Sequence, residues 1–421
     1  MSCRGRVYPH RPALWFTAMG SSITVVGIGA DGWAGVAPAG RAHVLRADVL
    51  LGGRRHLASV PDSGATREPW PSPLLAGLDD VLARHAGRSI VALASGDPLV
   101  SGIGSTLIRR LGRDAVHVIP AVSSVALARA RMGWAAENCE TVTLVGRNVD
   151  TLRRYLSRDR RLIVLTSDAS SLDVVARLLV DEGFGAARVT ILSNLGSEAD
   201  ESRRVGTARE FVGVPGDDLS LLCIECAGAE GNSTVPGLPD ECFEHDGQLS
   251  KRPIRVAAVC ALAPKPGQLL WDVGAGAGSV GIEWARTDPS CRTIALERNP
   301  SRAETVQRNA SRLGVPTSVR VLLGGAPEAL SGLETPDAIF VGGGGSRAGV
   351  LDACWNALRE GGRLVAHSVT LETEAVLVEW WKTYGGELTR LSVEQAAPIG
   401  TFTGWQSLRP VVQWSVVKGG K

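Results

Sequence analysis

An apolar run that leads into three spaced glycines constrains the fold of the chain's second half most strongly. Leu269–Val273 is strand-like, and Gly274, Gly276 and Gly278 follow it before a helix-like stretch. Glycine permits tight turns and close approach to a ligand because it has no Cβ, and the helix behind the loop begins with free N–H groups. Glu297 ends the next strand-like run, where a carboxylate can accept both hydroxyls of a ribose. The segment therefore predicts a strand–loop–helix unit that binds a nucleoside.

Two kinds of cofactor fit this loop. The stretch Gly276–Gly281 matches the GxGxxG pattern of dinucleotide sites, with Glu297 as the acid for the ribose. Asp272, just before the loop, would repel the pyrophosphate of a dinucleotide but suits the ammonium group of S-adenosylmethionine. The loop thus favours a methyl donor, with an NAD-dependent oxidoreductase as the alternative. An RNA-modifying methyltransferase is a further alternative, although a formal net charge of +2 supplies no basic field for nucleic acid.

Strand-like runs alternate with helical periodicity along most of the chain, which predicts two α/β domains with largely parallel sheets. The stretch 229–239 is rich in Gly, Pro and small polar residues and is the best linker candidate. We therefore predict a disordered tail over 1–18, a first domain over 19–228 and a second domain over 240–421. In the first domain the expected strands are Ile23–Ile28, Ser89–Ala94, Ala115–Ile119, Thr141–Val145, Leu162–Thr166 and Val189–Ser193, and the expected helices are Ile103–Leu111, Ser123–Met132 and Ser171–Asp181. In the second domain a helix near Lys251–Leu262 precedes the expected strands Leu269–Val273, Thr293–Glu297, Val319–Leu323, Ala338–Val341, Arg363–Ser368 and Val411–Val417.

The second half resembles the class I, Rossmann-like fold of methyltransferases that use S-adenosylmethionine, through its glycine loop, its acid-ended second strand and its late strand Val411–Val417. A narrower resemblance, to the C15-methylating and decarboxylating component of cobalamin biosynthesis, is carried by the stretches 240–252, 270–276, 325–330, 336–343 and 361–365. This resemblance implies that Gly342–Gly345 borders the acceptor. It also implies that Ala326 lies near the adenine and that the donor is held by Asp272, Gly274, Gly276, Gly278 and Glu297. His367 stands where the resemblance predicts a different residue, and it is either an added polar contact or a histidine at the edge of the core.

Three consecutive polar residues before the second domain's first helix are the acid–base candidates. They are Glu244, His245 and Asp246. Histidine titrates at about pH 6.5 when unperturbed, so proton exchange is plausible there. The alternative is that the trio caps the start of the helix. We expect no metal at either site, because no cluster of His and Cys has ligand spacing.

The first half carries three loops that each follow a strand-like run, within the stretches Val25–Gly32, Ala94–Leu99 and Ile119–Ala128. Open α/β sheets bind ligands where such loops converge at one sheet edge. Together the loops resemble the tetrapyrrole methylase family, whose fold has two α/β lobes, and in particular its C5-methylating member. By this resemblance the candidates for binding the donor are Gly29, Gly96, Asp97, Ser123 and Ser124. Ala30, Val100 and Ser101 depart from the family's usual residues, and Asp97 has an alternative role as a helix N-cap.

The order of the two halves resembles the fused precorrin-6Y C5,15-methyltransferases (decarboxylating). The resemblance implies methylation of C5 and C15 of precorrin-6Y, or of a cobalt-containing analogue, and loss of carbon dioxide from the C12 acetate to give precorrin-8X. It also implies one S-adenosylmethionine per domain. We expect a cytoplasmic homo-oligomer whose eight cysteines are reduced, with no nucleic-acid or membrane partner. No apolar stretch approaches the roughly 20 residues that span a bilayer.

Overall fold

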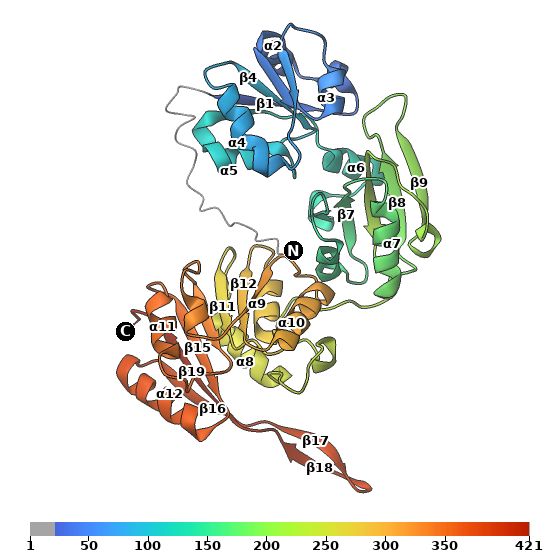
Figure 1. Ribbon diagram of the computed structural model, residues 1–421. Coiled ribbons are helices and arrows are strands. Elements are labelled where there is room, and N and C mark those ends of the chain that lie inside the picture. Colours follow the sequence, from blue (N-terminus) through green and yellow to red (C-terminus); the bar gives the residue numbers. More distant parts are fainter. Residues whose placement is uncertain (1–21, 421) are drawn as a thin grey trace. The chain divides into compact units, whose positions relative to one another are not determined.

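The computed structural model describes residues 22–420 and divides into two compact units. Unit 1 comprises the described residues up to Gly146 together with Asp159–Gly228, and unit 2 comprises Arg147–Arg158 and the chain from Ala229 onward (Figure 1). The tail predicted over 1–18 lies outside the described residues. Within 22–420, no helix combines the length and the apolar character that a membrane span requires.

The first lobe of unit 1 is a parallel sheet with helices on both faces. Its strands have the order β3-β2-β4-β1-β5. Val25 in β1 packs toward α4 and α5, whereas Val26 packs toward α2 and α3. Burial on both faces explains why β1, β2 and β4 are almost wholly apolar, whereas the edge strand β3 is polar and largely exposed. The elements are β1 (Ile23–Ile28), α2 (Pro38–Arg46), β2 (Val49–Gly52), α3 (Arg54–Ser59), β3 (Thr66–Pro69), α4 (Leu74–Arg84), β4 (Ile90–Ser95), α5 (Ile103–Leu111) and β5 (Val116–Ile119).

The second lobe of unit 1 corrects the expectation of a largely parallel sheet. Its strand order is β6-β7-β10-β8-β9, and only β6 and β7 run parallel, because β10 and β9 return beside their partners without a crossover α-helix. Cys223 is wholly buried in the central strand β10. The elements are α6 (Ser124–Met132), β6 (Glu140–Thr143), β7 (Arg161–Leu165), α7 (Ser171–Asp181), β8 (Arg188–Ser193), β9 (Ser202–Thr207) and β10 (Ser220–Glu225).

Unit 2 is built on a seven-stranded sheet with the order β13-β12-β11-β14-β15-β19-β16, in which β19 is antiparallel to both neighbours. Leu270 in β11 packs toward α8 and α9, while Trp271 packs toward α11 and α12. The elements are α8 (Arg252–Leu262), β11 (Leu269–Val273), α9 (Ser279–Thr287), β12 (Arg292–Glu297), α10 (Pro300–Arg312), β13 (Val319–Leu323), β14 (Ala338–Val341), α11 (Val350–Ala357), β15 (Arg363–Ser368), α12 (Leu371–Tyr384), β16 (Glu387–Leu391) and β19 (Val411–Val417). The parallel order with one late antiparallel strand is the architecture predicted for this half.

Two connecting segments are fastened to unit 2. Arg147–Arg158 lies inside the range predicted for the first domain, yet buried Arg154 donates to the carbonyl oxygen of Arg286 at 2.9 Å. The stretch expected to be a linker is held by Glu283, whose carboxylate accepts from the backbone N–H groups of Gly237 and Leu238 at 2.8 and 2.9 Å. Short 3-10 helices occur at Gly32–Gly35, Arg113–Ala115, Ala136–Asn138, Val149–Tyr155, Arg209–Phe211, Asp240–Cys242 and Glu328–Leu330.

A two-stranded hairpin extends from the seven-stranded sheet of unit 2 (Figure 1). Its strands are β17 (Glu394–Ile399) and β18 (Phe402–Ser407). The hairpin exposes three large apolar side chains, with exposed fractions of 62% for Ile399, 79% for Phe402 and 73% for Trp405. Nothing else in the described part of unit 2 pairs with either strand.

Candidate active sites

The three loops predicted to converge in unit 1 meet at the carboxyl edge of its first sheet. The N–H of Gly96 donates to the carbonyl oxygen of Ile28 at 2.9 Å, which joins the loop after β4 to the end of β1. Gly96 has a φ of +53°, and a Cβ at this position would lie 3.3 Å from the carbonyl oxygen of Val122. A side chain here would crowd the third loop and adopt a backbone conformation that favours glycine, so glycine suits the position where the second and third loops touch.

A cavity of about 420 Å³ opens at this edge, between the two lobes of unit 1. All five residues predicted to bind the donor in this half line it: Gly29, Gly96, Asp97, Ser123 and Ser124. The second lobe contributes Leu165, Leu192 and the stretch Asp218–Leu221. The cavity combines an apolar wall with a few polar groups, as small-molecule sites do. The role of the five residues in binding remains a prediction.

Two of these residues also stabilise the backbone around them. Ser123 is the N-cap of α6, and its hydroxyl accepts from the N–H of Ala126 at 3.1 Å. Asp97 accepts from the N–H of Leu99 at 2.8 Å and so stabilises the turn after β4. The N-cap of α5 is Gly102, so the alternative role of Asp97 as a helix cap does not hold.

A polar cluster on the same cavity wall was missed by the sequence analysis. Arg55 and His56 lie in the first turn of α3, after the end of β2, and Ser95 ends β4. The Nη2 of Arg55 lies 2.9 Å from the Nε2 of His56 and donates to the hydroxyl of Ser95 at 3.3 Å, while that hydroxyl lies 3.1 Å from the same Nε2. Burial, reinforced by the charge of Arg55, lowers the pKa of His56 to about 4. The position of Arg55 and His56 directly after an apolar strand is the signal that could have identified them.

Backbone angles and close contacts explain why the loop of unit 2 has glycine at three positions. Gly274, Gly276 and Gly278 have φ values of +72°, +59° and +78°. An added Cβ would lie 2.8 Å from the Gly343 carbonyl oxygen at the first position, and 2.6 Å from a methyl of Val306 at the third. The loops after β11 and β14 therefore touch where the strand order reverses, which is where open α/β sheets bind ligands.

Two carboxylates lie under and beside this loop. Asp272 has an exposed fraction of 1%; its Oδ2 accepts from the N–H of Gly281 at 3.0 Å, and its Oδ1 has no hydrogen-bond partner among the described residues. Burial raises the pKa of Asp272 to about 7, the hydrogen bond from Gly281 opposes this, and the charge of Glu297 adds to it. Glu297, at the end of β12, accepts from the N–H of Gly276 at 2.9 Å and from that of Asn299 at 2.9 Å.

The acid–base trio lies on an exposed loop that borders the glycine loop. Buried Asn309 joins the two loops, because its Nδ2 donates at 2.9 Å to the carbonyl oxygens of both Glu244 and Ala277. The capping interpretation is wrong, since the N-cap of α8 is Lys251 and the first N–H of the helix, that of Arg252, donates to Asp240 at 3.0 Å rather than to a member of the trio.

Each member of the trio has a partner. Glu244 pairs with Arg308 at 2.8 Å and Asp246 pairs with Arg302 at 2.7 Å. The hydrogen bond from Arg302, more than any other contact, lowers the pKa of Asp246. The Nδ1 of His245 accepts from the N–H of Gly247 at 3.0 Å, so its Nε2 is the ring atom left for other contacts.

The remaining positions named for unit 2 lie along the same carboxyl edge. His367 is 9% exposed in β15, has its Nε2 2.9 Å from the Oε1 of Gln413, and packs edge-on against Phe340. Burial lowers the pKa of His367, so it is a neutral histidine at the edge of the core. Ala326 is half-buried, and its carbonyl oxygen accepts from Arg347 at 2.8 Å. Over residues 22–420, no group of three or more His, Cys, Asp and Glu is arranged to hold a metal ion.

Both halves match known protein families. Residues 22–212 match the tetrapyrrole (corrin/porphyrin) methylases and residues 241–418 match a precorrin methyltransferase domain. A precorrin-6Y C(5,15)-methyltransferase [decarboxylating] of Sinorhizobium sp is 44% identical over 402 residues, which are 94% of this chain and 96% of that protein. The protein of the same name from Mycobacterium tuberculosis (strain CDC 1551 / Oshkosh) is 44% identical over 94% of this chain and its own full length. A solved C-terminal domain of precorrin-6Y C5,15-methyltransferase from Rhodobacter capsulatus is 43% identical, covers 44% of this chain and all of that domain, and has a TM-score of 0.43.

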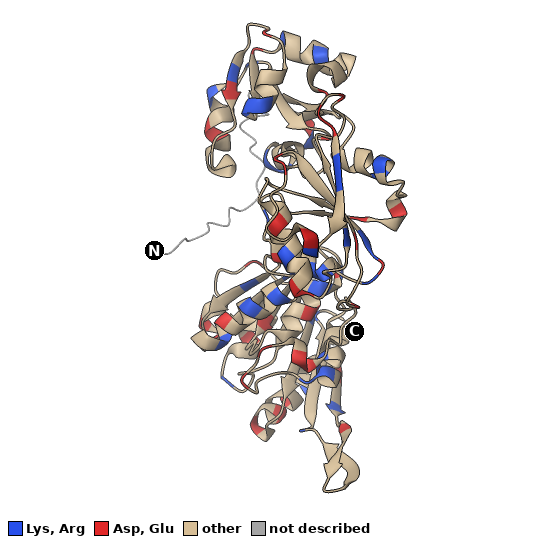
Figure 2. Ribbon diagram, turned by 90° about the vertical axis from the view of Figure 1, so that its right-hand side faces the viewer, with Lys and Arg blue, Asp and Glu red and all other residues tan. Residues whose placement is uncertain are grey.

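Two methyltransferase domains in one chain define the class of protein, and they confirm the predicted pair of folds. The chain belongs to the family of precorrin-6Y C5,15-methyltransferases (decarboxylating). This assignment decides against the NAD-dependent oxidoreductase and the RNA-modifying enzyme. Figure 2 shows acidic and basic residues interspersed along the ribbon in both units.

Proposed function

We propose that this chain methylates C5 and C15 of precorrin-6Y and removes carbon dioxide from the C12 acetate, giving precorrin-8X. Unit 1 would methylate C5, and unit 2 would methylate C15 and decarboxylate. The observation that carries this assignment is the presence of a separate glycine-edged site in each unit of a chain from this family. S-Adenosylmethionine supplies an electrophilic methyl group to an electron-rich carbon of the macrocycle.

The donor set of unit 2 fits S-adenosylmethionine. The orphaned Oδ1 of Asp272 and the carboxylate of Glu297 offer acceptors for an ammonium group and for ribose hydroxyls. Gly274, Gly276 and Gly278, with positive φ values, let the loop turn tightly beside these two carboxylates and pack against Gly343 and Val306. We propose that Ala326 borders the adenine and that Gly342–Gly345 borders the acceptor carbon.

In unit 1 we propose that the donor occupies the 420 Å³ cavity and is held by the five predicted residues, Gly29, Gly96, Asp97, Ser123 and Ser124. The protein's task in both units is to hold the two reacting atoms about 3–3.5 Å apart and in line, away from water. Apolar walls such as Leu165 and Leu192 exclude water from the unit 1 cavity.

For decarboxylation we propose His245 as the group that exchanges a proton, with its exposed Nε2 facing the substrate. Glu244 and Asp246, each paired with an arginine of α10, would position the loop. Methylation of C15 leaves an iminium-like system conjugated to C12, which can accept the electron pair as carbon dioxide leaves. In the full chain, His245→Ala should slow carbon dioxide release while Asp246→Asn has a smaller effect. Wild-type release by both variants would exclude these residues as catalysts.

We further propose a homo-oligomer that forms through the hairpin of β17 and β18, because its exposed Ile399, Phe402 and Trp405 form an apolar surface. The described cysteines are reduced, which fits a reducing, cytoplasmic compartment.

The direct test is mass spectrometry of the product that the full chain makes from S-adenosylmethionine and precorrin-6Y, with a cobalt-containing analogue tested in parallel. The product should carry two added methyl groups and lack one carbon dioxide. A product with no added methyl group from either substrate would refute the assignment.

A further inference from the structure

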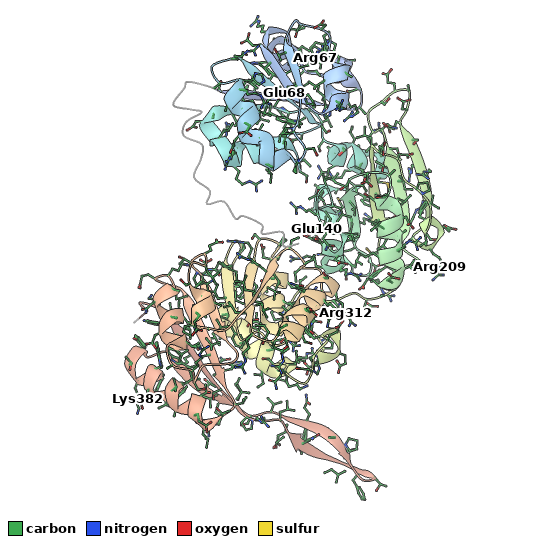
Figure 3. All side chains as sticks on the ribbon, viewed as in Figure 1. Arg67, Glu68, Glu140, Arg209, Arg312 and Lys382 are labelled. Carbon is green, nitrogen blue, oxygen red and sulfur yellow. The ribbon has the colours of Figure 1, made fainter. Side chains whose placement is uncertain are left out.

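The cluster of Arg55, His56 and Ser95 lies on the wall of the unit 1 cavity, but it is outside the set of residues assigned to the methyl donor. Hydrogen bonds from a neighbouring strand hold the helix that carries Arg55 and His56. Arg67 of β3 (labelled in Figure 3) donates to the carbonyl oxygens of Leu57 and Pro61 at 2.6 and 2.7 Å, and so fixes the C-terminal end of the short helix that carries Arg55 and His56. These hydrogen bonds hold the cluster in its place on the cavity wall.

Arg55 is a cation whose partners carry no charge. Its guanidinium makes hydrogen bonds to the ring of His56 and to the hydroxyl of Ser95, and no carboxylate among residues 22–420 forms an ion pair with it. Of the described residues that line the cavity, Arg55 is the sole lysine or arginine. Arginine can bind a carboxylate through two parallel hydrogen bonds. The Arg55 guanidinium, which has no acidic partner, is therefore suited to bind an anionic ligand in the cavity.

His56 keeps this charge available because it is a neutral partner. With its pKa lowered to about 4, the ring is uncharged at neutral pH, and its Nε2 accepts a hydrogen bond from the Nη2 of Arg55. An acid at the same place would neutralise the guanidinium, whereas a neutral acceptor orients it and leaves its charge for the ligand. His56 is thus a positioning residue for Arg55.

The location of Arg55 separates it from the donor candidates. Those residues follow β1, follow β4 or begin α6, whereas Arg55 follows β2, which lies on the other side of β4 from β1. The methyl donor also carries a carboxylate, but none of the five residues proposed to hold the donor follows β2; Gly96 and Asp97 follow β4, and the others follow β1 or begin α6. The acetate and propionate arms of a precorrin are the other carboxylates that the reaction brings into this cavity.

Resting on the proposed C5-methylating function of unit 1, we propose that Arg55 binds a side-chain carboxylate of the macrocycle and that His56 and Ser95 hold its guanidinium in place. This contact would set how the macrocycle is oriented over the donor, and thereby which meso carbon faces the methyl group. Arg55 would then determine how tightly the macrocycle binds and which of its carbons is methylated, and it would take no part in the methyl transfer itself.

The test uses the full chain, with methyl-labelled S-adenosylmethionine so that methylation at C5 can be followed by NMR. Arg55→Gln should raise the KM for precorrin-6Y in C5 methylation by about 10- to 100-fold, since a hydrogen-bonded charge pair is lost. Arg55→Lys should recover part of this loss. The Kd for S-adenosylhomocysteine, measured by calorimetry, should stay within about twofold of wild type. The matched control is Arg54→Gln, because Arg54 is an exposed neighbour that does not line the cavity, and its KM should be unchanged.

The His56 variants test the positioning role. His56→Leu should raise the same KM, and His56→Gln, which keeps a neutral acceptor, should restore it toward wild type. A wild-type KM for precorrin-6Y in Arg55→Gln would overturn the proposal. If, in addition, the affinity for S-adenosylhomocysteine were weaker, Arg55 would be assigned to the carboxylate of the donor. Failure of the underlying function gives a different result: the wild-type chain itself would then add no methyl group at C5.

Discussion

Replacement of Asp272 by asparagine should stabilise unit 2 at pH 8 while weakening its binding of the methyl donor. The folded-state pKa of Asp272 is about 7, compared with an ordinary value of 3.8. The folded state therefore binds more protons than the unfolded state between these values, so the contribution of Asp272 to stability is complete below about pH 4 and is lost as the pH rises to about 7. A difference of about three pH units corresponds to about 4 kcal/mol.

Asparagine removes this ionisation. Its Oδ1 can still accept from the N–H of Gly281, but its amide N–H₂ replaces the orphaned Oδ1 of Asp272 as a buried group without a partner, at a cost of about 1–3 kcal/mol. The net gain at pH 8 should be about 2 kcal/mol. The decline in stability between about pH 4 and pH 7 that Asp272 causes should disappear in the variant.

Urea denaturation of the full chain, followed by tryptophan fluorescence at several pH values, measures this directly, since buried Trp271 is adjacent to the substitution. Asp352→Asn, which changes an exposed acid of α11, is the matched control and should leave the pH dependence intact. In the wild type, affinity for S-adenosylmethionine should rise with pH toward 8, because an ionised Asp272 favours the cationic donor. Identical pH dependence of stability in wild type and Asp272→Asn would refute this reasoning.

Three further changes test other parts of the structure. Gly274→Ala places a Cβ 2.8 Å from the Gly343 carbonyl oxygen at a φ of +72°, so it should destabilise unit 2 by about 1–3 kcal/mol and abolish donor binding there. Calorimetry that shows wild-type binding of S-adenosylhomocysteine by unit 2 would contradict the proposed role of the glycine loop. Arg255→Met leaves buried Glu283 without its cation and should cost about 3–5 kcal/mol in denaturant unfolding. Adding Glu283→Gln removes the unpaired charge but keeps an amide oxygen as an acceptor for the N–H groups of Gly237 and Leu238, so it should recover part of the loss if the buried charge is the cause. Phe402→Ser should lower the assembly mass seen by light scattering, and an unchanged mass would argue against the hairpin as the contact.

Much of the scaffold follows from local sequence. Strands such as Leu269–Val273 and Ile23–Ile28 were identified with the bounds that the structure shows, because strands buried on both faces are continuous apolar runs. The positions of Gly274 and Gly278 followed from the need for a backbone without side chains, and their positive φ values bear this out.

Other features depend on contacts that local patterns do not encode. Strand β9 is mostly polar and partly exposed, and the hairpin of β17 and β18 is exposed along most of its length, so neither carries an apolar run. The placement of Arg147–Arg158 in unit 2 depends on Arg154, whose partner Arg286 is far away in the chain. Arg55 and His56 become part of the cavity wall only when β2 pairs beside β4.

The central claim is that one chain holds two independent sites for the methyl donor. Calorimetric titration of the full wild-type chain with S-adenosylhomocysteine tests it most directly. We predict two equivalents bound per chain, falling to one in Gly274→Ala, which leaves the cavity of unit 1 untouched. Uptake of one equivalent or none by the wild-type protein would contradict the account.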